Sequence, residues 1–123
     1  MWSTFFRDGG WGMYPTATFG FLLVASGILC LLRPERRYVP LVLSLGAVTL
    51  GAGLLAFCVG VVKTFHYLPE VAAEDRLSVA GLGCAESLHN VVLALMLIVV
   101  TALLGAVAAL RAARGARPAA PAA

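Results

Sequence analysis

The chain has 123 residues, of which 61% are hydrophobic and only 12% are charged, and its formal net charge is +3. An average soluble domain carries about a quarter charged residues, and a small domain has a large surface to cover with polar groups, so the composition argues against a water-soluble enzyme. The basic excess is too small and too scattered for a nucleic-acid groove, and membrane topology explains it more simply.

Three long apolar stretches follow one another along the chain, at about 16–32, 38–62 and 91–110. A helix needs about 20 mainly apolar residues to cross the hydrocarbon core of a bilayer. Continuous apolar runs also lack the alternation that is typical of a barrel strand. The sequence therefore predicts an all-α fold, a three-helix transmembrane bundle within residues 1–113. An Ala/Pro-rich tail at 114–123 is predicted to be disordered.

Prolines mark the connections between the predicted spans. Pro34 cannot continue the first helix, which leaves a tight connection at 34–37. After the second span, Pro69 can open a new helix, and Glu70 is favourable at its positive end. We expect residues 70–90 to form a helical approach to the third span.

The cations are distributed unevenly between the two sides of the predicted bundle. Six of the nine lie in or next to the first connection and the tail, and the positive-inside rule assigns that side to the cytoplasm. The N-terminus is then expected outside and the C-terminus inside. These six cations are Arg33, Arg36, Arg37, Arg111, Arg114 and Arg117.

Small residues recur at four-residue spacing within two of the spans. Such rows let helices approach closely in lipid, so they predict packing faces, either within one chain or between copies in a homo-oligomer. One row is Ala52, Ala56 and Gly60, and the other is Thr101, Gly105, Ala109 and Ala113.

Glu86, His89 and Asn90 form the main polar cluster, at the start of the third span. Their spacing of three and four places them on neighbouring faces of one helix. An ionisable residue at membrane depth is a functional candidate, and a neighbouring carboxylate tunes a histidine for proton exchange. The alternative is that both ionisable groups lie among the lipid headgroups, where polarity costs little.

Thr49 and Thr101 are the polar residues deepest within the spans. A threonine in lipid commonly bonds the backbone of its own helix, and a path-lining role is the less common alternative. Glu86, His89 and Thr101 are therefore the candidates for a proton path.

No motif in the sequence indicates an enzyme, a cofactor or a metal. The three cysteines, Cys30, Cys58 and Cys84, form no CxxC pair, which argues against a disulfide framework or a structural zinc. His66 is too weakly placed to complete a ligand set with Glu86 and His89. A nucleophile–base pair and a Gly-rich phosphate loop are both missing.

Three short segments resemble elements of the MotA/TolQ/ExbB proton-channel family. They are GGWGMYP at 9–15, GVVKTF at 60–65 and GCAESL at 83–88. The segments fall in the order of that family, at the start of the first span, the end of the second and the start of the third. The orientation expected from the charges also matches the family.

The resemblance implies a subunit of a ring in the bacterial inner membrane. In that family the ring surrounds single-span partners of the ExbD/TolR/MotB kind, and each partner brings a membrane aspartate. Proton flow then drives rotation or force transmission. The glutamate of the family would correspond to Glu86, with His89 and Thr101 as further contributors.

The sequence departs from the family in three respects. Only residues 34–37 stand where the family has a large cytoplasmic segment, and Phe57 and Val91 replace hydroxyl-bearing residues of the family's spans. These departures are typical of a minimal relative with weakened conduction. They leave a second hypothesis open, a small membrane scaffold or interaction protein that conducts nothing.

Overall fold

The structure is a computed structural model that describes residues 3–4, 7, 10–33 and 35–115. Three long α-helices dominate it, and none of the described residues lies in a strand. The expected all-α class is confirmed, and all three helices are long and apolar enough to cross a membrane. The elements are α2 (Met13–Leu32), α3 (Tyr38–Tyr67), the short 3-10 helix η1 (Leu68–Glu70) and α4 (Arg76–Gly115).

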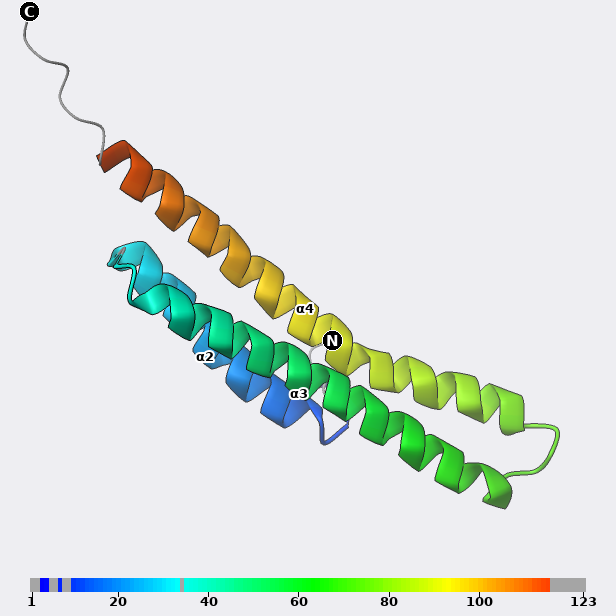
Figure 1. Cartoon of the computed structure of the whole chain (residues 1–123). Coiled ribbons are helices and arrows are strands. Elements are labelled where there is room, and N and C mark those ends of the chain that lie inside the picture. Colours follow the sequence, from blue (N-terminus) through cyan, green and yellow to red (C-terminus); the bar gives the residue numbers. More distant parts are fainter. Residues whose placement is uncertain (1–2, 5–6, 8–9, 34, 116–123) are drawn as a thin grey trace, which may run out of the picture.

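The helices form an up-and-down bundle in which each one contacts the other two (Figure 1). α2 is much shorter than its neighbours. A Cβ atom added at Gly12, just before α2, would lie 3.3 Å from Oδ1 of Asn90 and would also meet Ala56. α2 therefore begins level with Ala56 and Asn90. Beyond that level, α3 and α4 continue together as a two-helix segment, which we call the arm (residues 57–67 and 76–89).

Small and polar residues fill the places where the helices meet. Gly53 of α3 is buried against α4, because a Cβ atom at this position would lie 2.7 Å from Cβ of Ala94 and 3.0 Å from the backbone oxygen of Asn90. Large apolar side chains instead cover the outside of the bundle, where Phe21 and Leu43 are 72% and 69% exposed. This inverted distribution suits a lipid environment, in which close backbone approach, and not exclusion of apolar groups from water, holds helices together.

The helices are longer than the apolar runs that predict them. α2 begins at Met13, three residues before the predicted span, and α3 continues to Tyr67, five residues beyond it. Backbone hydrogen bonding within a helix does not stop where hydropathy falls, so polar residues such as Lys63 extend a helix that apolar residues define.

The predicted helical approach at 70–90 differs from the structure at its start. η1 ends at Glu70, Val71 is extended (φ −92°, ψ 145°), and α4 begins only at Arg76. The chain must reverse here so that α4 can return antiparallel to α3, and this reversal needs non-helical backbone. From Arg76 the approach and the third span form one continuous helix of 40 residues. That helix includes residues 114–115 of the predicted tail, and residues 116–123 lie outside the described part.

α2 ends where the sequence places a proline. Arg33 is extended (φ −132°, ψ 90°), and its backbone N–H still donates to the Leu29 carbonyl. The residue before a proline is pushed out of the helical region by the proline ring. This local rule accounts for the short connection that brings α3 back beside α2.

Candidate functional site

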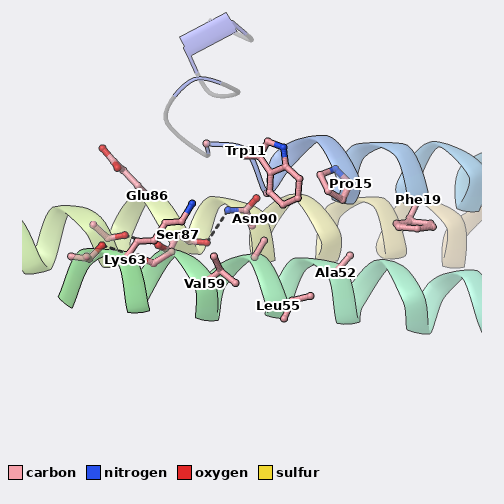
Figure 2. Close-up of a pocket in the computed structure, with 16 residues that line it drawn as sticks. Trp11, Pro15, Phe19, Ala52, Leu55, Val59, Lys63, Glu86, Ser87 and Asn90 are labelled. Carbon is pink, nitrogen blue, oxygen red and sulfur yellow. Dashed lines mark hydrogen bonds between the residues drawn. The ribbon is translucent and has the colours of Figure 1, made fainter. Parts of the chain in front are cut away.

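A groove of about 440 Å³ lies where α2 begins and the arm continues without it (Figure 2). We call it the head groove. Trp11 forms part of its rim and is 76% exposed. The segments 9–15, 60–65 and 83–88, which are far apart in the sequence, all contribute to its lining. The contributing residues are Gly10, Trp11, Gly12 and Pro15, then Gly60, Lys63 and Thr64, then Gly83, Glu86 and Ser87; Gly9 is not among the described residues.

Two glycines allow α3 and α4 to lie close together at the floor of this groove. A Cβ atom at Gly60 would overlap the Ser87 side chain, and one at Gly83 would overlap the Thr64 side chain. The two contacts are reciprocal, since each helix offers one glycine to a hydroxyl residue of the other. Their arrangement fixes the relative position of the helices that carry Lys63 and Glu86.

The charged groups of the head groove are Lys63 of α3 and Glu86 of α4, and both are exposed. Figure 2 shows the Glu86 side chain pointing away from α3, on the open side of the groove. An exposed carboxylate on a groove rim exchanges protons with water directly. The structure therefore places Glu86 on the exposed rim of the head groove.

Two hydroxyl groups beneath the groove bond within their own helices. Ser87 Oγ donates to the Gly83 carbonyl at 2.7 Å, and Thr64 Oγ1 donates to the Gly60 carbonyl at 2.9 Å. Asn90 is 2% exposed, and its Nδ2 donates to the Ser87 carbonyl at 3.4 Å. The hydrogen bonds of the two hydroxyls therefore do not link α3 to α4.

The other two predicted proton-path residues lie away from the head groove. His89 is half-buried, and its Nδ1 lies 2.9 Å from the Ala85 carbonyl oxygen. Thr101 is buried, its Oγ1 donates to the Leu97 carbonyl at 2.8 Å, and it lines a different groove. Fifteen residues of helix separate Thr101 from Glu86, which is about 22 Å along the axis. Glu86 is thus brought together with Lys63 and not with Thr101.

The predicted packing row of α3 lies at contacts with other helices or at the head groove. Ala56 lies against Gly12, Gly60 lies against Ser87, and Ala52 lines the head groove. On α4, Gly105 and Ala109 are exposed, and a Cβ atom at Gly105 would meet nothing within 4 Å. These two residues therefore make no close helix contact within the chain, and their packing between copies stays a prediction.

The buried face of α4 lies beside the predicted row. Thr101 belongs to both the buried face and the predicted row. Residues of the buried face recur every seven positions, and this spacing could have revealed the face from the sequence. These residues are Ser87, Ala94, Thr101 and Ala108.

No group of three His, Cys, Asp or Glu side chains within the described ranges could hold a metal ion. Comparisons with protein-family models, with curated proteins and with solved structures found no match. The interpretation of the head groove therefore rests on its geometry and its chemistry.

Proposed function

We propose that this integral membrane protein is a subunit of a proton-conducting complex similar to MotA/TolQ/ExbB, with Glu86 at the proton entrance. One observation supports the proposal above the others. The three segments that carry the resemblance line one groove. The second and third face each other across the reversal between α3 and α4, and the first, which lies far from them in the sequence, joins them at the start of α2.

In the proposed complex, copies of this chain surround a single-span partner that carries a membrane carboxylate. Glu86 takes up a proton from water at the groove rim and passes it to the acidic group of the partner. The partner's helix must supply the path through the bilayer, since the buried hydroxyls of this chain bond within their own helices. The complex lies in a bacterial inner membrane, with the head groove on the outer side.

The second candidate function is a non-conducting membrane scaffold. The same within-helix hydrogen bonds favour it, because they use up the donors that a proton path would need. Under this hypothesis the head groove is only the place where a short helix meets two long ones.

A proton-flux measurement separates the two functions. The tagged chain is purified in mild detergent with the proteins that remain bound to it and is reconstituted into liposomes containing a pH-sensitive dye. A potassium diffusion potential then drives proton entry. If Glu86 is the entrance group, Glu86→Gln lowers the flux by about a hundredfold, the scale on which positioned proton-transfer groups act.

Glu74→Gln is the matched control, because Glu74 is exposed in the connection and does not line the groove. It removes the same charge and should leave the flux unchanged. Equal flux in the wild-type, Glu86→Gln and Glu86→Ala proteins would exclude Glu86 as the entrance. No flux at all, together with a monomeric chain in mild detergent, would favour the scaffold.

A further inference from the structure

A second groove, of about 370 Å³, lies at the opposite end of the bundle from the head groove. We call it the tail groove. It runs between the last turns of α2, the first turns of α3 and the C-terminal half of α4. Its walls are apolar and mostly small, and they include Gly27, Val39, Leu43, Gly105 and Ala109.

The tail groove lies at the depth of the bilayer, within the segments whose composition suits a membrane span. Gly105 is exposed on its wall, and the position of a Cβ atom there is open space. An open apolar groove between spanning helices is bathed in lipid and not in water, so an apolar chain fills it at no cost in lost hydrogen bonds.

The tail groove is lined mainly by small and apolar residues of the three helices. A lipid acyl chain carries no hydrogen-bonding group along its length, so it leaves none unpaired in such a groove.

The charge at the mouth of the groove indicates which headgroup follows the acyl chain. Arg36 lines the mouth, together with Glu35. The Glu35 carboxylate is already paired with Arg37, at 2.5 Å, and the Arg37 guanidinium lies over the Tyr38 ring. Arg36 is therefore the cation of this connection that faces the groove, and α4 brings Arg111 to the same end.

A second copy docked in the tail groove in the same membrane orientation would bring its own arginines to the groove mouth beside Arg36, and the like charges would repel. An anionic headgroup is attracted instead. Basic pockets between spanning helices on the cytoplasmic side are a known mode of anionic lipid recognition.

We propose that the tail groove binds an anionic phospholipid, with one acyl chain between α4 and the α2–α3 hairpin and the phosphate at Arg36. The lipid fills the tail groove and neutralises part of the arginine cluster. This site is independent of Glu86 and of proton movement, so its test does not depend on the proposed function.

Native mass spectrometry of the full chain in mild detergent tests the proposal. The protein is titrated with phosphatidylglycerol or with phosphatidylcholine of the same acyl chains, and the bound fraction is counted. We expect retention of phosphatidylglycerol in preference to phosphatidylcholine. Arg36→Gln should weaken phosphatidylglycerol binding by about fivefold, which corresponds to one cation at an anionic surface. Arg33→Gln removes the same charge from an exposed residue that does not line the groove, and it should have a smaller effect.

Gly105→Leu fills the groove from its wall and should abolish the binding of phosphatidylglycerol. Its matched control is Gly51→Leu, because Gly51 is equally exposed, has the same open space at its Cβ position and lines neither groove. Unchanged phosphatidylglycerol binding by Gly105→Leu would overturn the site. Equal retention of the two lipids by the wild type would overturn the role of Arg36. A lipid-free dimer that Gly105→Leu converts to a monomer would assign the groove to a second copy.

Discussion

Hydroxyl side chains in the interior of this bundle donate hydrogen bonds to carbonyl groups of their own helices. Thr16, Thr49 and Thr101 donate to the carbonyl four residues earlier, and Ser26 donates to the one three residues earlier. Where water is excluded, the preceding turn always offers an acceptor, so a buried threonine needs no partner on another helix. The presence of hydroxyls inside the spans therefore does not indicate a proton path.

Thr101 provides a test of this argument at the residue scale. Thr101→Val keeps the branched shape that fits against Gly27, where a Cβ atom would lie 3.0 Å from Thr101 Cγ2, and it removes only the hydroxyl. The Leu97 carbonyl remains bonded to the backbone of its own helix. We expect the free energy of unfolding to change by less than about 1 kcal/mol and the proton flux to stay at the wild-type level.

Thermal unfolding followed by circular dichroism in detergent, and the flux assay described above, measure these two quantities. Thr101→Ala is the contrasting variant, because it also removes the methyl group that contacts the Gly27 region. A large loss of flux in Thr101→Val with normal stability would restore Thr101 to the proton path.

At the scale of single helices, the sequence predicts which segments are helical better than which face of each helix is buried. The three apolar runs identify α2, α3 and the second half of α4, because length and hydropathy suffice to define a span. The buried face of α4 is not evident, since small residues occur all around it. Gly105 and Ala109 have the right spacing for packing, but Thr101 and Ala108 are the residues that α4 buries at that level, and the neighbouring face with Gly105 and Ala109 is exposed.

The head groove illustrates a second limit of sequence reasoning. Glu86 stands out as an isolated carboxylate near a span, whereas Lys63 reads as an ordinary interfacial cation at the end of one. Only the pairing of α3 with α4, set by Gly60 and Gly83, brings the two onto one rim. Such proximity depends on the register between helices, and no spacing within one helix encodes it.

The contact between α3 and α4 predicts unequal effects for two neighbouring glycines. At Gly53, an added methyl group would press on Ala94 and on the Asn90 carbonyl, which is backbone and cannot move alone. Gly53→Ala should therefore destabilise the protein by about 1–3 kcal/mol, the usual cost of overpacking. At Gly51 the same methyl group enters open space, and Gly51→Ala should be neutral or stabilising through its better helix propensity.

The midpoint of thermal unfolding in detergent, compared with that of the wild type, measures both changes. The two variants are chemically identical and two residues apart, so a difference between them reports packing and not helix propensity. Equal midpoints for the two would show that α3 and α4 are not held as close at Gly53 as the structure has them.

At the scale of the whole molecule, α2 sets the thickness of the part that three helices share. Its 20 residues span about 30 Å, which matches the hydrocarbon core. If α2 crosses the bilayer, the arm projects about 16 Å beyond it on the side of the head groove. The arm and the connection between its two helices carry Lys63 and Arg76 beside four acidic residues, and the arginine-rich connection lies at the opposite end. The acidic residues are Glu70, Glu74, Asp75 and Glu86.

This arrangement predicts which sites a membrane-impermeant maleimide reaches in intact cells. The background is a chain whose three free cysteines, Cys30, Cys58 and Cys84, are replaced by serine. A cysteine at Asp75, exposed in the connection after the arm, should react from outside. A cysteine at Arg36 should react only after the cells are permeabilised, because the positive-inside rule assigns the arginine-rich end to the cytoplasm.

Two further positions test the depth of the bilayer on the same molecule. Leu77 of the arm is 87% exposed and Leu103 of the spanning part is 63% exposed, so exposure in the isolated chain does not separate them. A maleimide needs a hydrated thiolate, so a cysteine at Leu77 should react with the impermeant reagent, and one at Leu103 should stay unreactive even after permeabilisation. Labelling at Leu103 would show that this part of the bundle does not lie in the bilayer. Labelling at Arg36 in intact cells would show the opposite orientation, with the head groove and Glu86 on the cytoplasmic side.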